Sequence, residues 1–545
     1  MKKSFALAFA SGILLFGSCA GDAPEAPNPG PIDEEGNIGY IRIDFPGTTT
    51  RALETTAPNA KELEIENAAF VFYCDNGYNF TCYARKERRA SDKAYWVEVE
   101  GDKHEGQRCA IVKLPQMPRS VAVIVNTERT NIGGDLNEDA TPITKYCKGD
   151  NELFYMSSTR YWDEANNLSC ETPISADKIY REESDAIKAL DENGNINAVL
   201  INVEHYVAKV NVTHKYSDPK YKLDADGQLN PQAVKEEVEG AIVKFKPEYT
   251  FLTATSTKTT TIKKLPEFGL LATWVQNWKD LNDPVNRHSS WLRMEETPRE
   301  VSWPTLNDLQ TKKLPLGHKS VAYSSTEPFY AFDNRDDDYG RRTSVVVTGK
   351  YTVTDAAGKD LSYTEAMKNA DIAAGKTPQE VGTFWLVAFQ DKFTVYNNEL
   401  DAIKAMGGEE GDQLEPDVTL PDGQNELKGR TDGAWTSWTG WMRISGKNFE
   451  TRCIKYCGGY GYYAKPINHF TPANTSTNVS YDMVVRNHYY DVSITGIQGM
   501  GVGIPTPNDP IVPVIPPNPN DQNYWLHMSV KVLDWRNIVN DVEWQ

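Results

Sequence analysis

Short segments in which apolar and polar residues alternate dominate the chain from residue 38 onward. They are rich in β-branched and aromatic residues and are separated by Asn, Asp, Gly and Pro, which is typical of antiparallel β-sandwiches. Helical periodicity is confined to two stretches, residues 179–190 and 361–374, which we interpret as insertions between strands. The pattern predicts strands at residues 38–45, 63–73, 95–99, 120–126, 199–213, 343–353, 382–389, 461–467, 487–497 and 524–533.

A chain of 545 residues is too long for one small hydrophobic core, and two large domains are the simplest division. We therefore predict an all-β protein with a few short helical insertions. Residues 38–205 form an N-terminal β-sandwich domain and residues 206–504 a C-terminal one. A Pro-rich spacer at residues 505–523 then leads to a terminal strand segment at residues 524–545.

The first 19 residues have the pattern of a secretion signal, with two lysines, an apolar run from residue 4 to 16, and small residues before Cys19. This ending resembles a lipobox, in which Cys19 would be lipidated and become the mature N-terminus, although Phe16 stands where an aliphatic residue is usual. The alternative is an ordinary signal peptide with an incidental cysteine. Residues 20–37 are almost free of apolar side chains and are expected to form a flexible tether.

The last strand segment alternates with a period of two, so that one of its faces is apolar. Seven prolines within residues 505–520 precede it, and a polyproline II conformation at about 3.1 Å per residue would span roughly 50 Å. A strand on such a spacer can reach a neighbouring molecule, and the alternative is that it closes its own domain. The predicted donor face consists of Tyr524, Leu526, Met528, Val530 and Val532.

The first strand, residues 38–45, also alternates, with Ile41, Ile43 and Phe45 on its apolar face. A loop of small residues follows it and contains Arg51 and Ala52, which makes the Arg51–Ala52 bond a candidate site for a trypsin-like protease. Residues 38–51 would then be a removable first strand with its cleavage loop, and a cut after Arg51 would free the strand to leave its sheet. The open groove could then accept the terminal strand of another copy, and such a head-to-tail contact builds a filament.

The remaining chemistry of the sequence argues against catalysis and against several classes of partner. The net charge of −19 disfavours nucleic acid and gives no attraction to anionic membranes. The sequence contains no HExxH, GxSxG or Walker A motif, and we predict no enzyme activity, no catalytic residues, no metal site and no cofactor. Seven cysteines follow Cys19, an odd number that excludes complete intramolecular pairing. The acidic run at residues 333–338 is interpreted as solvated surface.

A surface lipoprotein that binds glycans is the main functional alternative, because tryptophan rings can stack on sugars. Burial in the core of a large sandwich is the other use of such rings. The candidate residues are Trp274, Trp278, Trp291, Trp435, Trp438 and Trp441.

Four segments resemble the FimA/Mfa fimbrillin family of Bacteroides-type bacteria, especially its short-fimbria major subunits. Residues 484–497 (VVRNHYYDVSITGI) resemble the penultimate strand of the family, and residues 528–544 (MSVKVLDWRNIVNDVEW) resemble its terminal signature. Residues 329–334 (FYAFDN) and 343–350 (TSVVVTGK) resemble a turn and the following strand of its second domain.

The resemblance implies two transthyretin-like β-sandwich domains, export as a lipoprotein, cleavage after an arginine beyond the first strand, and polymerisation by strand exchange. Arg51 stands at the matching place. The implied partners are other copies of the chain, accessory tip and anchor subunits, a trypsin-like maturation protease, and host or bacterial surface receptors. The expected location is the outer membrane for the precursor and a surface fimbria for the mature subunit, with a tip or anchor subunit as the alternative to a shaft subunit.

Overall fold

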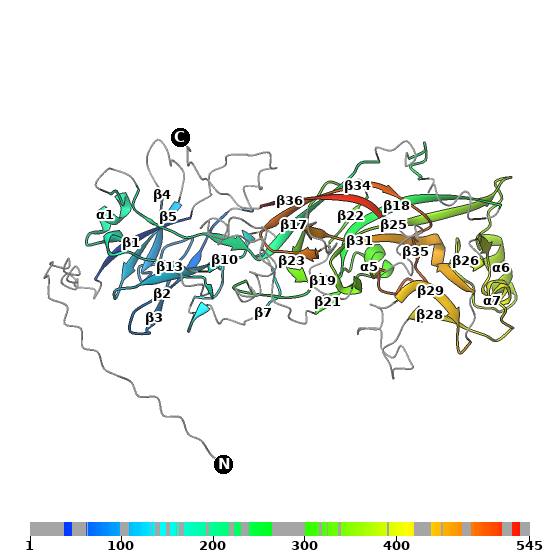
Figure 1. Cartoon of the computed structure of the whole chain (residues 1–545), viewed down its shortest axis with the longest axis horizontal. Helices are drawn as coiled ribbons and strands as arrows, with labels where there is room; N and C mark the ends of the chain where they lie inside the picture. Colours follow the sequence, from blue (N-terminus) through cyan, green and yellow to red (C-terminus); the bar gives the residue numbers. More distant parts are fainter. Residues whose placement is uncertain are drawn as a thin grey trace, which may run out of the picture.

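Strand segments from the first half of the chain form one large sheet at one end of an elongated molecule (Figure 1). The structure is a computed structural model that describes residues 38–45, 62, 64–98, 108–130, 132–136, 142–145, 147–148, 153–159, 161–162, 168–191, 196–216, 223–229, 238, 240–263, 300–315, 319–323, 325–335, 339–389, 392–418, 438–447, 451–470, 481–514 and 526–534.

We call the large sheet the N-terminal sheet; its main path runs β14-β1-β5-β4-β3-β2-β6-β10-β16, with β13 beside β6 and β15 beside β1. Most neighbours are antiparallel, but β1 with β15 and β3 with β4 are parallel. The strands are β1 (Gly39–Asp44), β2 (Ala68–Tyr73), β3 (Asn79–Ala84), β4 (Ala94–Glu98), β5 (Arg108–Leu114), β6 (Ser120–Val125), β10 (Met156–Ser158), β13 (Thr172–Pro173), β14 (Ile179–Tyr180), β15 (Val199–Leu200) and β16 (Val203–His205).

Three larger sheets make up most of the rest of the described body, beside a small three-stranded sheet and several strand pairs. The four-stranded sheet has the order β23-β17-β34-β36, the long-strand sheet β22-β18-β25-β31-β35, and the distal sheet β27-β26-β30-β29-β28. Their strands are β17 (Val207–His214), β18 (Ala241–Thr253), β22 (Ser320–Ala322), β23 (Phe329–Phe332), β25 (Ser344–Asp355), β26 (Phe384–Phe389), β27 (Lys392–Tyr396), β28 (Leu414–Val418), β29 (Trp438–Ile444), β30 (Arg452–Tyr456), β31 (Tyr460–Pro466), β34 (His488–Ile497), β35 (Val502–Gly503) and β36 (Leu526–Asp534).

Short strand pairs and helices complete the described fold. The α-helices are α1 (Glu183–Lys188), α5 (Leu306–Thr311), α6 (Glu365–Ala373) and α7 (Glu399–Ala405), and none of the helices in the described residues is long and apolar enough to cross a membrane. The short strands are β7 (Pro142–Ile143), β8 (Cys147–Lys148), β9 (Leu153–Phe154), β11 (Tyr161–Trp162), β12 (Leu168–Ser169), β19 (Thr255–Ser256), β20 (Thr259–Thr260), β21 (Val301–Ser302), β24 (Asn334–Arg335), β32 (Asn468–Phe470) and β33 (Tyr481–Val484). The 3₁₀ turns are η4 (Ala176–Lys178), η6 (Tyr339–Arg341) and η8 (Cys457–Gly459).

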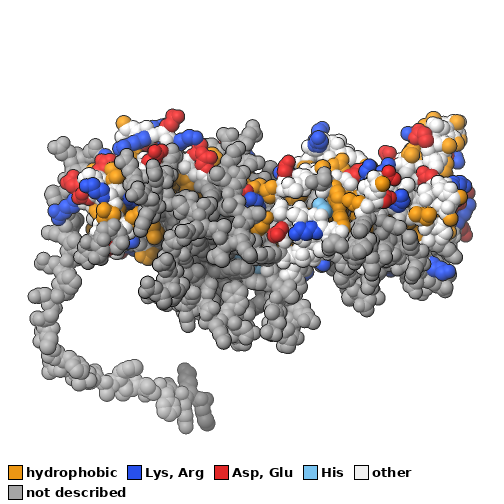
Figure 2. All heavy atoms as spheres, turned by 90° about the horizontal axis from the view of Figure 1, so that it is seen from above, with side chains coloured by type: hydrophobic (Ala, Val, Ile, Leu, Met, Phe, Trp, Pro, Cys, Tyr) orange, Lys and Arg blue, Asp and Glu red, His pale blue; other side chains and the backbone are white. Residues whose placement is uncertain are grey.

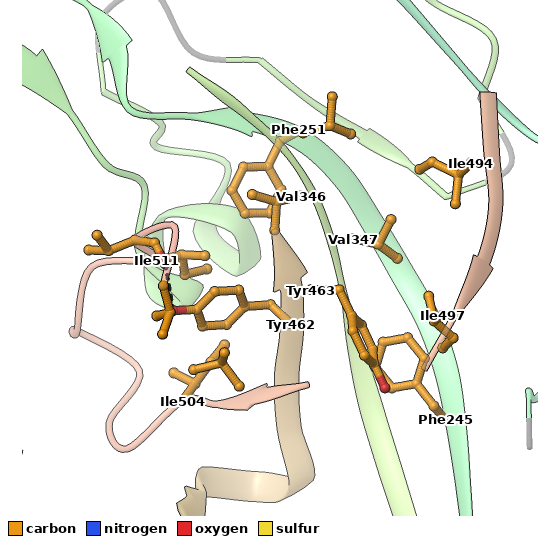
Figure 3. Packing of buried hydrophobic residues seen from close by; sticks show 14 of the residues in the cluster. Phe245, Phe251, Val346, Val347, Tyr462, Tyr463, Ile494, Ile497, Ile504 and Ile511 are labelled. Carbon is orange, nitrogen blue, oxygen red and sulfur yellow. Dashed lines mark hydrogen bonds between the residues drawn. The ribbon is translucent and has the colours of Figure 1, made fainter. Parts of the chain in front are cut away.

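The largest core lies between the four-stranded sheet and the long-strand sheet. Ile494 and Ile497 of β34 contribute to it from one side, and Phe245, Val347 and Tyr463 from the other (Figure 3). A second core belongs to the N-terminal sheet and contains the apolar residues of β1. The prediction of an all-β protein with few short helices is therefore confirmed.

A close contact within the long-strand sheet requires a glycine. β18 and β25 pair antiparallel along their length, with a register shift between Pro247 and Tyr249. A Cβ atom at Gly349 would lie 2.1 Å from the backbone oxygen of Lys246, which no side chain can tolerate. Gly349 lets the two backbones approach at this irregularity.

The structure shortens the predicted spacer. Its first part, residues 505–514, belongs to the folded body, because Ile511 and Val512 are fully buried in the largest core and Ile511 N donates to the backbone oxygen of Pro304. Apolar side chains between the prolines thus hold this part of the chain in place. The remainder of the predicted spacer lies outside the described residues.

Both predicted helical stretches are only partly helical. Residues 179–190 contain the short strand β14 before α1, and residues 361–374 contain α6. Helix α6 begins at the N-cap Thr364, whose side chain accepts a hydrogen bond from Met367 N. Local capping thus decides where the helix starts, which hydrophobic periodicity alone does not define.

His214 at the end of β17 is partly buried among aromatic rings. Its ring lies 4.0 Å from that of Tyr323 between centroids, and its Nε2 lies 3.0 Å from Thr250 Oγ1. Burial lowers the pKa of His214 to about 4, whereas histidine in an unfolded chain titrates near pH 6.5. At this residue the unfolded chain therefore binds more protons than the folded one below about pH 6.5. The contribution of His214 to the free energy of unfolding is full above that pH and is lost as the pH falls toward 4.

The variant His214→Asn is expected to reduce the acid sensitivity of the fold. Between pH 7 and pH 5 the wild-type protein should lose about 1–2 kcal/mol more unfolding free energy than the variant, because asparagine takes up no proton. Urea unfolding of both proteins at the two pH values measures the difference. Equal losses in the two proteins would contradict the assignment of this sensitivity to His214.

Candidate functional site

The first strand is an internal strand of the N-terminal sheet. β1 pairs antiparallel with β5 from Gly39 opposite Leu114 to Ile43 opposite Ala110, and β14 and β15 cover its other edge. Ile41 and Ile43 are fully buried and Phe45 is 7% exposed. All three predicted residues of the displaced strand therefore lie in one core, where Phe45 also contacts the rings of Phe70 and Trp96.

The opposite face of β1 contains a buried ion pair. The Arg42 guanidinium donates two hydrogen bonds to Asp44, at 2.8 and 2.9 Å, and a third to the backbone oxygen of Ile187 at 2.9 Å. Burial opposes ionisation of Arg42, but the hydrogen bond and charge of Asp44 outweigh it and raise its pKa above the usual value. The alternation of the sequence places Arg42 on this face but gives no sign that it is only 2% exposed.

The loop that contains the predicted cleavage site starts and ends in two different parts of the fold. Arg51 and Ala52 themselves lie outside the described residues. Before the loop, Phe45 is buried in the N-terminal core. After it, the Glu62 carboxylate accepts hydrogen bonds from Lys209 Nζ at 2.7 Å and Tyr330 OH at 2.6 Å. A cut between these two points would leave β1 held by noncovalent contacts alone on that side.

The terminal strand pairs with its own chain. β36 runs antiparallel to β34, from Leu526 opposite Ile497 to Asp534 opposite His488, and takes the outer position of the four-stranded sheet. In Figure 1 it lies along β34, away from β1. This arrangement is the one in which the terminal strand closes its own domain.

The described side chains of β36 follow the predicted alternation. Met528 and Val530 are half-buried against the largest core, whereas Ser529 between them is exposed. Leu526 and Val532 have backbone positions in the strand, and Tyr524 lies outside the described residues. The donor face is thus less buried at this edge than the corresponding face of β1.

The turn before β34 joins the two halves of the molecule through buried polar groups. Arg486 is fully buried, and its Nη2 donates to the backbone oxygen of Thr260 at 3.0 Å and lies 3.4 Å from Asp333 Oδ1. Asn487 has a left-handed φ of 61° and its Oδ1 accepts from His205 N of the N-terminal sheet at 3.2 Å. The Arg-Asn pair that carries part of the sequence resemblance therefore has a structural role at this junction.

The interpretation of residues 333–338 as solvated surface is wrong for its first two residues, because Asp333 and Asn334 are both buried. Asp333 is fully buried and accepts a hydrogen bond from Thr259 Oγ1 at 2.6 Å in addition to its pairing with Arg486. An acidic run favours solvent only where no distant cation faces it, and Arg486 lies 153 positions further along the chain. Residues 336–338 lie outside the described residues.

The described cysteines are mostly buried. Cys74, Cys82, Cys109, Cys453 and Cys457 are free thiols. Burial raises the pKa of both Cys82 and Cys453 to about 12, so neither thiol ionises readily at neutral pH. Within the described residues, no cluster of three or more His, Cys, Asp or Glu side chains is placed to hold a metal ion.

Trp441, one of the rings suggested for glycan stacking, is part of the core. It is 7% exposed and stacks on Phe393 with centroids 6.2 Å apart. Trp274, Trp278, Trp291 and Trp435 lie outside the described residues, as does the side chain of Trp438. Among the six tryptophans suggested for glycan stacking, the one whose side chain is described therefore packs within the protein.

The described fold is thus all-β, with β1 buried inside one sheet and β36 at the edge of another. Residues 454–541 match the family model described as "Major fimbrial subunit protein type IV, Fimbrillin, C-terminal". The matched range contains the Arg486 turn, β34 and β36. This match confirms the resemblance over the C-terminal region of the chain.

Several solved structures align with most of the chain at low sequence identity. A candidate cell adhesion protein from Parabacteroides distasonis has 12% identity and a TM-score of 0.36, with 91% of this chain and 100% of that chain covered. A candidate cell adhesion protein from Bacteroides eggerthii has 10% identity and a TM-score of 0.35, with 91% of this chain and 96% of that chain covered. The tip fimbrial protein Mfa3 from Porphyromonas gingivalis, truncated at its C-terminus, has 9% identity and a TM-score of 0.28, with 91% of this chain and 99% of that chain covered. TM-scores this low do not establish a shared fold or function. No curated protein matches the chain significantly.

Proposed function

We propose that the chain is a structural shaft subunit of a surface fimbria, assembled by exchange of its terminal strand after removal of β1. One observation carries this proposal. β1 is a fully inserted strand followed by a loop with a candidate protease site, while β36 has the same alternation and sits on a sheet edge. A strand that vacates a core leaves a groove that an alternating strand can fill.

The burial of the two strands supports exchange over a permanently closed state. Fully burying an aliphatic side chain stabilises by about 1.5–3 kcal/mol, and a half-buried one gains only part of this. Met528 and Val530 are half-buried on β34, whereas Ile41 and Ile43 are fully buried in the N-terminal core. A terminal strand that moves from the edge into the emptied groove therefore gains apolar burial.

Maturation in this scheme has two covalent steps. The precursor is exported, lipidated at Cys19 and held on the outer membrane, and a trypsin-like protease then cuts between Arg51 and Ala52. Cleavage removes the lipid together with β1, so the assembled subunit is held in the fimbria by strand contacts. The fimbria would serve adhesion through tip and anchor subunits and surface receptors, and the chain itself would have a structural role without catalysis.

The proposal is tested by trypsin treatment of the chain from residue 20, with and without residues 522–545. We expect an SDS-resistant ladder in unheated samples only for the chain that retains its terminal segment. Arg51→Ala should prevent both the cut and the ladder, because the groove stays filled. A chain that is cut at Arg51, retains its terminal segment and never forms a ladder would overturn the proposal. Binding of the uncut monomer to a glycan array would favour the glycan-binding alternative.

A further inference from the structure

The departure of β1 would remove a cation from a buried place beside helix α1. Arg42 is 2% exposed, and its Nη1 donates to the backbone oxygens of Ile187 at 2.9 Å and Lys188 at 3.5 Å. Both oxygens lie at the C-terminal end of α1, where helix carbonyls carry partial negative charge. Asp44, the other partner of Arg42, lies on β1 and would leave with it.

An incoming strand that lacks a donor at this position would leave these carbonyls without their partner, which weakens binding. In β36 the apolar positions 526, 528, 530 and 532 must face the core, so positions 527, 529, 531 and 533 face α1. His527 and Lys531 are the residues of that second set with a nitrogen donor on the side chain. Of the two, Lys531 has a long aliphatic stem and an ammonium donor, and it is flanked by Val530 and Val532 as Arg42 is flanked by Ile41 and Ile43.

The direction of the incoming strand follows from the residue that takes the place of Phe45, the next apolar position of β1 after Ile43. If the strand ran in the direction of β1 with Lys531 at the place of Arg42, Asp534 would fall at the place of Phe45, which is 7% exposed in the core. In the opposite direction Met528 takes that place, Val530 replaces Ile43 and Val532 replaces Ile41. An unpaired carboxylate in an apolar core is strongly disfavoured, so the opposite direction is the compatible one.

The end of the groove agrees with this direction. A Cβ atom at Gly39 would lie 2.8 Å from the backbone oxygen of Tyr180 in β14, so a side chain there requires β14 to shift or the strand to end. In the opposite direction Asp534 reaches this point, and in the present fold Asp534 pairs with His488, the first residue of β34. In the direction of β1, with Lys531 again at the place of Arg42, Met528 would stand there with the strand continuing beyond it.

From these constraints we infer that the terminal strand enters the groove antiparallel to the β1 it replaces, with Lys531 at the place of Arg42 as the residue that fixes its register. This inference rests on the proposed function. Lys531 then donates to the carbonyl end of α1, and Ser529 and Leu533 occupy the places of Asp44 and Tyr40. Lys531 is thus a specificity residue that selects one register among those that the apolar alternation allows.

Binding of a labelled peptide of residues 522–545 tests the register. The acceptor is the trypsin-cut, full-length Val530→Asp chain, whose own terminal strand cannot compete, and the readout is labelled protein in unheated SDS gels. Lys531→Met in the peptide should weaken binding about tenfold or more, Lys531→Arg should restore it, and His527→Gln should have little effect. Unchanged binding of the Lys531→Met peptide, or a loss confined to His527→Gln, would overturn the assignment. If the unmodified peptide does not bind at all, the proposed function itself fails.

Photo-crosslinking tests the direction independently. A benzophenone residue at position 533 of the peptide should attach near Tyr180, because Tyr40 lies opposite Tyr180. The same residue at position 529 should attach near Leu200, because Asp44 lies opposite Leu200. Mass spectrometry locates the crosslinks, and the reverse assignment of the two positions would overturn the inferred direction.

Discussion

Replacing Val530 by aspartate is expected to abolish the SDS-resistant ladder of the trypsin-cut chain. Val530 lies on the apolar face of β36, and the proposed exchange carries it into a core where Ile43 is fully buried. Burying a carboxylate without a partner costs several kcal/mol, which exceeds what one aliphatic side chain contributes. Unheated gel electrophoresis after trypsin treatment measures the result.

The matched control is Ser529→Asp, which introduces the same charge one position away. Ser529 is exposed and lies on the other face of the strand, so this variant should form ladders like the wild-type protein. A further check mixes cut Val530→Asp chains with cut wild-type chains. The variant keeps an intact groove, so it should terminate wild-type ladders at one end. Normal ladders from Val530→Asp alone would show that this face of β36 is not the donor face.

Arg486→Met is expected to destabilise the folded chain by about 3–5 kcal/mol, because it removes one partner of a buried ion pair. Arg486 and Asp333 are both fully buried, and their closest charged atoms are 3.4 Å apart. Methionine has a similar reach but donates no hydrogen bond, so Asp333 and the backbone oxygen of Thr260 lose a donor. Urea unfolding monitored by tryptophan fluorescence measures the loss, with the midpoint and slope compared at one pH.

A surface ion pair provides the control for this variant. Arg443 pairs with Glu415 at 3.0 Å, and both side chains are more than a third exposed, so Arg443→Met should cost less than about 1 kcal/mol. The double variant Arg486→Met with Asp333→Leu should recover part of the loss, because no uncompensated charge then remains buried. Equal stability of the Arg486→Met and Arg443→Met proteins would contradict the structural role assigned to the junction.

Alternation with a period of two identifies β1, β34 and β36 in the sequence because each has one apolar face against a core. It does not identify β18, the longest strand, although Val243 and Phe245 alternate with Lys244 and Lys246 there. Pro247 and the register shift next to it interrupt the alternation, and proline normally argues against an inner strand. The parallel pairing of β17 with β34 is likewise invisible, because it joins residues about 280 positions apart.

The residues of the candidate site fall into the same two groups, those that the local sequence pattern predicts and those whose contacts depend on distant parts of the chain. The apolar residues of β1, and Met528 and Val530 of β36, lie on the faces on which local patterning places them. The polar contacts of Arg42, Glu62 and Arg486 depend on partners from distant parts of the chain, and charged residues are mostly exposed in folded proteins. The Arg-Asn pair at positions 486 and 487 was visible as a motif, but its meaning came only from Asp333 and His205.

The route of the chain between the two halves also determines how a filament of such subunits would respond to pulling. β16 ends at His205 and β17 begins at Val207, so a single residue separates a strand of the N-terminal sheet from a strand of the four-stranded sheet. Tension between the two ends of a subunit would run through this covalent crossing, with Glu62–Lys209 and Asn487–His205 beside it. Many hydrogen bonds along β17 and β34 would then be loaded together instead of being opened one by one, which makes the subunit mechanically stiff along its long axis.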